Sequence, residues 1–247
     1  MKIDFYEEFP TKENLEKLRL IKFPIRLFVA AKSIKEFKEL EKQIKKIKRG
    51  VKVTYWPIIP NSYWISPFSN TKDLIKMFGE LKKINNQILI DLEPPLKNKK
   101  LMAKNILWFF KNKKLIKNFL RENKERIIIA ERSRVIFSKR IEILMKVLGF
   151  SYNFGKKNPM FYTSMLNKKQ IKKCKKFLSK MKNKKDYTIG IGVIAIGILG
   201  NEPILPPENL EKDLKFVKDA GFDKVIIFRL GGLNKNYIKV INKFDTP

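Results

Sequence analysis

The sequence contains no histidine and a single cysteine, Cys174, among its 247 residues. Without imidazole there can be no Ser-His-Asp triad, no histidine general base and no zinc site with histidine ligands, and one thiol cannot form an intrachain disulfide. Any chemistry therefore has to use carboxylates, Tyr, Lys, Ser or a hard metal ion held by carboxylates. Cys174 falls on the apolar side of an expected helix, so we expect it to be a core residue.

Long apolar segments are also missing. The longest uncharged stretch, 187–201, is shorter than the roughly 20 residues that a membrane helix needs, and four glycines interrupt it. We expect these glycines to let the backbone pack closely. The first ten residues carry acidic side chains where a secretion signal has its apolar core. These features predict no membrane span and a cytoplasmic location, in agreement with the low cysteine content.

Positive charge is in large excess, since 55 Lys and Arg stand against 24 Asp and Glu and give a formal net charge of +31. Such a charge attracts polyanions at low salt. Most lysines, however, fall on the polar faces of expected helices, which spreads them around the fold. Lys also outnumbers Arg, the side chain preferred for phosphate and base recognition. We therefore favour a small-molecule or carbohydrate substrate over nucleic acid as the partner.

Short β-branched runs alternate eight times with stretches of helical period. The expected strands are 3–9, 26–31, 52–59, 87–93, 126–131, 160–165, 187–196 and 224–230, with 160–165 preferred over 150–154 as the sixth. The expected helices include one that Thr71 caps, one over 101–123 interrupted near Asn112, and one over 138–148. This order predicts a single (β/α)₈ barrel domain over residues 1–247. An open doubly wound sheet shares the alternation but usually has a glycine-rich turn after its first strand, where this chain has FYEEFP.

A barrel of this kind has its active site at the carboxyl ends of its strands, and here those ends are rich in acids. The acids at or just after the expected strand ends are Glu7, Glu8, Asp91, Glu93, Glu131 and Glu202. Asp91 and Glu93 lie two residues apart in a strand, so both face the barrel mouth while Ile90 and Leu92 face the helices. Burial and mutual repulsion can separate the pKa values of two such acids. We expect Glu93 to transfer a proton and Asp91 to assist it electrostatically.

The other candidates surround this pair. Glu131 and Glu202 are candidate second acids across the mouth, and Tyr162 is a candidate for proton chemistry. The residues assigned to substrate binding are Trp56, Tyr63, Trp64, Glu7 and Arg229, because aromatic rings stack on sugars and charged groups orient them. The structural alternative is that the acids cap helices or pair with bases such as Arg229, and that Trp56 packs in the core.

The strand-end pattern resembles that of the chitinase-like glycoside hydrolases of family 18. That barrel family ends its fourth strand with D-x-x-D-x-D-x-E and carries M-x-Y-D on its sixth. Here Asp91-Leu92-Glu93 matches the last D-x-E, with Asn86 and Leu89 at the earlier acidic positions, and Met160-Phe161-Tyr162 matches M-x-Y, with Thr163 in place of Asp. The resemblance implies that Glu93 donates a proton to the glycosidic oxygen, that Asp91 is its charged helper and that Tyr162 orients the substrate.

The sequence thus predicts a carboxylate-dependent enzyme that acts on a carbohydrate or a related polar small molecule, in the manner of a glycoside hydrolase and without a cofactor. Two alternatives stay open. In one, magnesium is held by Glu7, Asp91, Glu93, Glu131 and Glu202 in a lyase or isomerase. In the other, a non-catalytic barrel binds RNA or another polyanion through its lysine-rich surface.

Overall fold

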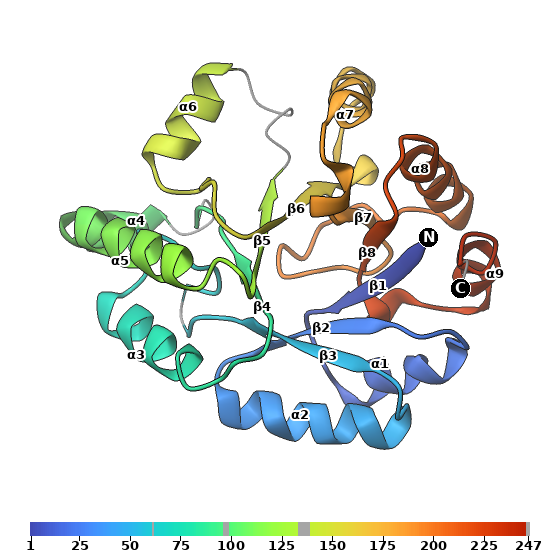
Figure 1. Cartoon of the computed structure of the whole chain (residues 1–247), viewed down its shortest axis with the longest axis horizontal. Coiled ribbons are helices and arrows are strands. Elements are labelled where there is room, and N and C mark those ends of the chain that lie inside the picture. The colour runs from blue at the N-terminus through green and yellow to red at the C-terminus, as the bar shows by residue number, and fades with distance from the viewer. Residues whose placement is uncertain (61, 96–98, 133–138, 246–247) are drawn as a thin grey trace.

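Eight parallel strands pair in sequence order, and the last pairs with the first to close a barrel (Figure 1). The computed structural model describes residues 1–60, 62–95, 99–132 and 139–245, and for 99, 132 and 139–142 the backbone alone. The strands are β1 (Lys2–Glu7), β2 (Arg26–Ala31), β3 (Lys52–Pro57), β4 (Ile88–Asp91), β5 (Ile127–Arg132), β6 (Lys156–Phe161), β7 (Ile189–Val193) and β8 (Lys224–Phe228). The predicted (β/α)₈ barrel is confirmed.

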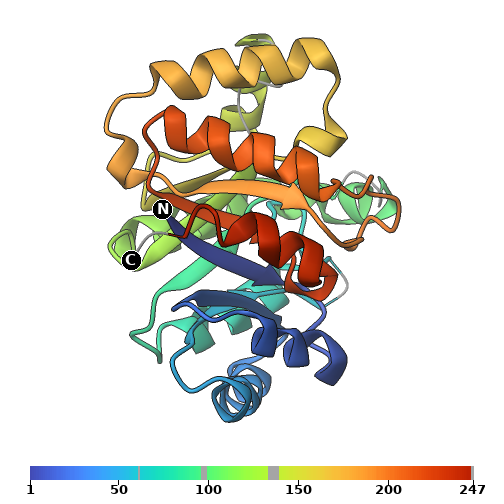
Figure 2. The ribbon, with the colours of Figure 1, turned by 90° about the vertical axis from the view of Figure 1, so that its right-hand side faces the viewer.

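Helices form an outer ring around the strands (Figure 1). They are α1 (Lys12–Glu16), α2 (Ile34–Ile47), α3 (Thr71–Leu81), α4 (Lys99–Asn105), α5 (Phe109–Glu122), α6 (Lys139–Val147), α7 (Lys168–Lys180), α8 (Pro207–Asp219) and α9 (Lys235–Ile241). Figure 2 shows α8 and α9 side by side outside the barrel, with the two chain ends close together. The N-terminal ammonium donates a hydrogen bond to the Phe244 carbonyl at 3.0 Å, which joins the first strand to the end of the chain.

The strands divide the core into two layers because successive side chains point to opposite faces. The inner cluster fills the barrel and consists of Tyr6, Phe28, Ala30, Trp56, Leu89, Ile128, Ala130 and Ile226. The larger outer cluster packs the other face of the strands on the helices, and Ile88, Ile90 and Leu92 belong to it. The predicted orientation of Ile90 and Leu92 toward the helices is therefore confirmed. Cys174 is fully buried in the same outer cluster, as expected.

Strand β6 differs from the prediction. It spans Lys156–Phe161 and not 160–165, and 150–154 is not a strand either. Its register is set by β5, with Ile128 opposite Lys156 and Ala130 opposite Asn158. The pattern of apolar residues misses this strand because two lysines open it.

Strand β7 ends earlier than predicted, at Val193. The register with β8 shifts between Ile191 and Val193, and Gly192 has a φ of 69°, which a residue with a side chain rarely adopts. This bulge ends the regular strand. The rest of the uncharged stretch forms a loop at the carboxyl end of the barrel.

The helical segment predicted over 101–123 is broken, but not near Asn112. The break is the 3₁₀ turn η2 (Ile106–Trp108) between α4 and α5. Asn112 lies fully buried inside α5, where its amide donates to the carbonyls of Pro67 at 3.0 Å and Ser69 at 2.8 Å. The cap of α3 also differs, since Asn70 and not Thr71 accepts the bonds from its first turn. The expected helix start at Ser138 lies outside the described residues.

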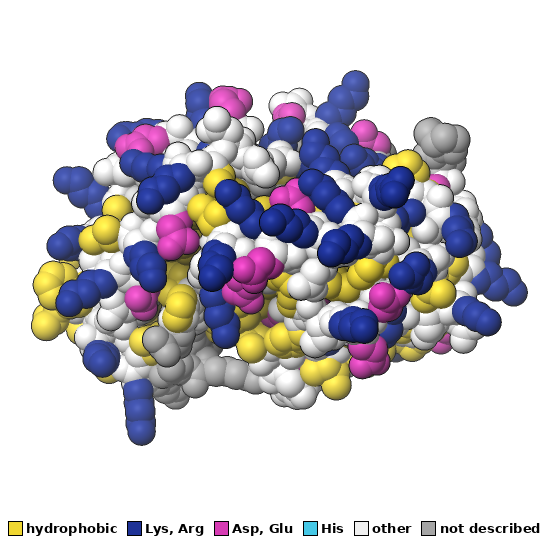
Figure 3. All heavy atoms as spheres, turned by 90° about the horizontal axis from the view of Figure 1, so that it is seen from below, with side chains coloured by type: hydrophobic (Ala, Val, Ile, Leu, Met, Phe, Trp, Pro, Cys, Tyr) yellow, Lys and Arg dark blue, Asp and Glu magenta, His cyan; other side chains and the backbone are white. Residues whose placement is uncertain are grey.

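Basic side chains cover the face seen in Figure 3 without gathering into one patch. This spread is what lysines on the polar faces of an outer helical ring produce. Among the residues that the structure describes, no helix is long and apolar enough to cross a membrane.

We expect Asn112→Leu to destabilise the protein by about 2 to 4 kcal/mol, because two buried carbonyls of the β3–α3 loop lose their donor. Asn118→Leu in the same helix, where the amide oxygen accepts an exposed hydrogen bond from Arg121, should change stability by less than about 0.5 kcal/mol. Urea unfolding followed by circular dichroism measures both values. Equal effects of the two substitutions would contradict the role given to Asn112.

Candidate active site

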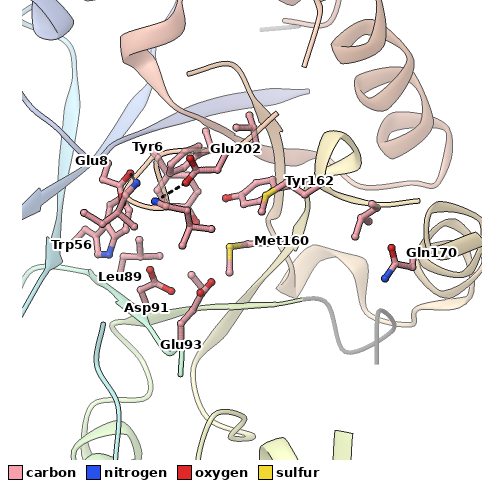
Figure 4. Close-up of a pocket in the computed structure, with 17 residues that line it drawn as sticks. Tyr6, Glu8, Trp56, Leu89, Asp91, Glu93, Met160, Tyr162, Gln170 and Glu202 are labelled. Carbon is pink, nitrogen blue, oxygen red and sulfur yellow. Dashed lines mark hydrogen bonds between the residues drawn. The ribbon is translucent and has the colours of Figure 1, made fainter. Parts of the chain in front are cut away.

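A cavity of about 300 Å³ opens at the carboxyl ends of the strands, which we call the barrel mouth (Figure 4). Four carboxylates line it, namely Glu8, Asp91, Glu93 and Glu202. Aromatic residues from four strands or strand ends line it as well, namely Tyr6, Trp56, Tyr162 and Phe228. The remaining walls are mostly apolar and include Leu89, Met160, Val193 and Leu199. The site therefore combines acids with apolar and aromatic surface.

Strand β4 directs Asp91 and Glu93 into this cavity. Asp91 lies on the same face as Leu89, which belongs to the inner cluster, and opposite Ala130 of β5. A hydrogen bond holds the end of β4, because the Ile65 amide of the loop after β3 donates to the Asp91 carbonyl at 3.2 Å. Both acids are more than nine-tenths buried, and Figure 4 shows them on one side of the cavity. Both side chains therefore point into the barrel mouth, as expected.

Glu8 enters the cavity from the opposite side, one residue after β1. Its carboxylate accepts hydrogen bonds from the Tyr63 hydroxyl and from the Ile198 amide, the latter at 2.9 Å. Burial raises the pKa of Glu8 to about 7, although both hydrogen bonds act to lower it. Glu8 is one of the expected strand-end acids, but no role is predicted for it. Alternation gives its direction, because Glu8 lies two residues after Tyr6 of the inner cluster, whereas Phe5 and Glu7 face the other way.

The loop after β7 brings Glu202 beside Glu8. The Leu199 amide donates to Glu202 Oε1 at 2.9 Å. At Gly197 a Cβ atom would lie 2.7 Å from Phe228 Cζ, 2.8 Å from Glu8 Oε2 and 2.9 Å from Glu202 Oε1, so any larger residue would push these side chains aside. At this glycine the backbone packs closely, as expected, and its neighbours are side chains of the cavity.

Tyr162 follows β6 and lines the cavity together with Met160. Burial raises the pKa of the Tyr162 hydroxyl well above its usual value, and the negative charges of Asp91, Glu93 and Glu8 raise it further. Tyr162 therefore stays protonated and can donate a hydrogen bond to a ligand. The neighbouring Thr163, which stands where the resemblance has Asp, donates a hydrogen bond from its hydroxyl to Asp213 of α8.

Glu7 and Arg229 lie outside the cavity and form an ion pair at 2.9 Å. Glu7 is fully buried and also accepts bonds from the amides of Phe9 at 2.8 Å and Gly231 at 2.7 Å. Arg229 also donates to the Ile196 carbonyl at 2.9 Å. Both side chains sit on the outer face of their strands, so they hold loops together and do not line the site, contrary to the substrate-binding role expected for them.

Glu131 is also on the outer face, because Ala130 takes the inward position of β5. It pairs with Lys157 at 3.5 Å, in a groove between the barrel and α7. Tyr63 and Trp64 are half-buried and stand behind the cavity wall. Tyr63 reaches Glu8 and packs edge-on against Trp56, and Trp64 packs on Tyr63. They support lining residues without lining the cavity themselves.

The five carboxylates considered for magnesium are not brought together. Glu7 and Glu131 face away from the cavity that holds the other three. Within the described part of the chain, no group of three Asp, Glu, His or Cys side chains is arranged to hold a metal ion. The five acids of the magnesium alternative therefore do not form one site.

Comparison with known proteins identifies the fold. No family model matches the sequence, and no curated protein matches it. A GH18 chitinase from Pseudoalteromonas aurantia superposes with a TM-score of 0.58 and 12% identity over 99% of this chain and 100% of its own. A chitinase from Ipomoea carnea gives 0.53 and 12% over 99% and 100%, and the spore cortex-lytic enzyme of Bacillus megaterium QM B1551 gives 0.53 and 11% over 99% and 74%. These likenesses agree with the fold that the strand-end motifs implied.

The raised pKa of Glu8 predicts a pH-dependent stability. The folded state binds the Glu8 proton more tightly than the unfolded chain, whose ordinary value is 4.5. Stability from this group is thus complete at low pH and is lost as pH rises through about 7. The unfolding free energy of the parent relative to Glu8→Gln should fall by up to about 3 kcal/mol between about pH 4 and pH 8. Urea unfolding at several pH values measures it, and parallel curves for the two proteins would contradict the assignment.

Proposed function

We propose that this protein is a glycoside hydrolase-like enzyme that acts on a neutral carbohydrate, with Glu93 as its proton donor. The observation that carries the proposal is the convergence of Asp91 and Glu93 from β4 with Glu8 and Glu202 on one buried cavity. Acids held on two sides of a reacting bond can serve as proton donor and proton acceptor, which is the chemistry of glycoside cleavage. The fold likeness to chitinases is consistent with this assignment.

The charge of the cavity selects the substrate class. Its described lining residues include four acids and no Lys or Arg, although the protein as a whole carries +31. A phosphorylated or carboxylated sugar would meet repulsion from these acids and no compensating base. A neutral sugar avoids that cost, and the aromatic walls offer apolar faces on which a sugar ring can pack.

Two buried polar atoms in the cavity wall support a polar ligand. Trp56 Nε1 and Glu202 Oε2 are buried and have no hydrogen-bond partner among the described residues. A buried donor or acceptor left in this state costs about 1 to 3 kcal/mol. Sugar hydroxyls both donate and accept hydrogen bonds, so they can satisfy the indole N–H and the carboxylate together.

In the proposed reaction the Glu93 carboxyl gives its proton to the glycosidic oxygen as the bond from that oxygen to the anomeric carbon breaks. The positive charge that develops on the sugar ring is stabilised by the carboxylate of Asp91. Water then forms the new bond to the anomeric carbon and gives its proton to Glu202. Tyr162, whose pKa is raised by burial, remains a hydroxyl donor that orients the sugar.

The decisive test compares Glu93→Gln with Glu131→Gln on a panel of neutral aryl glycosides, oligosaccharides and sugar phosphates. Loss of a positioned general acid should lower kcat by about 10²-fold to 10⁴-fold. Glu131→Gln makes the same chemical change at a strand end outside the cavity and should keep kcat within about threefold of the parent.

Two results would contradict the proposal. Equal turnover by the parent and Glu93→Gln would remove Glu93 from its role. Turnover of sugar phosphates in preference to neutral glycosides would overturn the substrate class inferred from the acidic lining.

A further inference from the structure

The segment that joins α4 to α5 exposes large apolar side chains at neighbouring positions. Ile106 is 58% exposed, Leu107 88%, Trp108 49% and Phe110 80%. We call these four residues the apolar ridge. Figure 3 shows hydrophobic side chains projecting at the left edge of the molecule, on the side where α4 and α5 lie in Figure 1. Exposed apolar residues grouped in this way mark an interaction surface more often than scattered single ones do.

The ridge is held outward by its own anchors. Asn105, just before it, is buried and donates to the Phe68 carbonyl at 2.9 Å. Phe109, within it, turns inward and packs on the Phe68 ring at 5.1 Å between centroids. Phe68 belongs to the loop after β3, so the ridge lies at the same end of the barrel as the cavity. The exposure of its side chains follows from a fixed backbone.

The neighbouring helix α6 extends this surface. Ile143 is 61% exposed and Val147 57%. The Lys113 ammonium of α5 donates to the Val147 carbonyl at 2.5 Å, which ties the end of α6 to α5 beside the ridge. Apolar side chains of two helices are therefore presented next to each other.

The surroundings of the ridge are basic. From residue 99 to residue 121 the chain has seven Lys and one Arg and no acidic residue. Lys104, Lys111 and Lys114 are exposed, and the Lys111 ammonium lies 5.3 Å from the centre of the Trp108 ring. The partner that fits is one with negative charge at its surface and an apolar layer beneath it. An anionic lipid surface has both.

Other partners fit less well. A second copy of the chain would bring a second charge of +31 against the first. A nucleic acid would satisfy the lysines but would give Leu107, the most exposed member, neither a hydrogen bond nor a stacking partner. We therefore propose that the apolar ridge and its lysines dock the protein on an anionic lipid surface. This docking is independent of the function proposed for the cavity.

The test is sedimentation of the full chain with vesicles of phosphatidylcholine alone or mixed with phosphatidylglycerol. The parent should bind the mixed vesicles, and high salt should weaken the binding. Leu107→Ser/Phe110→Ser should weaken partitioning into the mixed vesicles at least tenfold, because two apolar side chains that would enter the lipid are lost. The matched control is Ile75→Ser/Phe177→Ser, which removes exposed apolar groups of α3 and α7 and should bind as the parent does. All variants should show the parent's circular dichroism spectrum.

A second readout is the fluorescence of Trp108, which should shift to shorter wavelength with mixed vesicles, whereas Trp108→Phe should show no shift. The proposal is overturned if the parent does not bind mixed vesicles, if it binds neutral vesicles equally, or if the two double variants bind alike. It is also overturned if the ridge variant abolishes a dimer of the parent, or weakens RNA binding as much as vesicle binding. Those results would assign the ridge to a second copy or to RNA.

Discussion

Closure of eight parallel strands into a barrel commits alternate residues to the inside and to the helical layer. A shift of one residue along a strand therefore decides whether a carboxylate lines the cavity or faces the helical layer. Glu8 lines the cavity while Glu7, next to it, is buried against Arg229. Ala130 faces inward, so Glu131 faces outward. The composition of the site depends on this alternation more than on how many acids stand near the strand ends.

The alternation explains which predictions succeeded. The predicted direction of Asp91 and Glu93 is correct because Ile90 and Leu92, which alternate with them, face the helices. The predicted position of Glu131 at the barrel mouth is wrong. Glu131 lies two residues after Ile129, which belongs to the outer cluster, so alternation places both on the outer face of β5. By the same alternation, Glu8 and Phe228 face the cavity, whereas their neighbours Glu7 and Arg229 face outward.

Other features depend on contacts that a single sequence does not display. The start of β6 is hidden by Lys156 and Lys157, whose place in the sheet is set by pairing with β5. The bulge at Gly192 alters the alternation of β7 and brings Val193 to the cavity. The bond from the Ile198 amide to Glu8 comes from a loop far from β1 in the sequence. Tertiary contacts decide all three.

The cavity and the outer surface differ in charge. Four acids and no Lys or Arg line the cavity among the described residues, whereas the outer surface carries lysines with acids interspersed among them (Figure 3). Buried charges interact strongly with one another through the protein, while exposed lysines are screened by salt. This difference is the basis for the neutral substrate that we propose for the cavity, and it lets the two surfaces be assigned to different partners.

Glu8 and Glu202 share one desolvated cavity, which a carbon-13 NMR titration of the Glu8 side-chain carboxyl can test. This carboxyl should titrate with a pKa of about 7 in the parent, and Glu202→Gln should lower that pKa because the nearby negative charge is removed. A titration near the ordinary value of 4.5 in both proteins would contradict it.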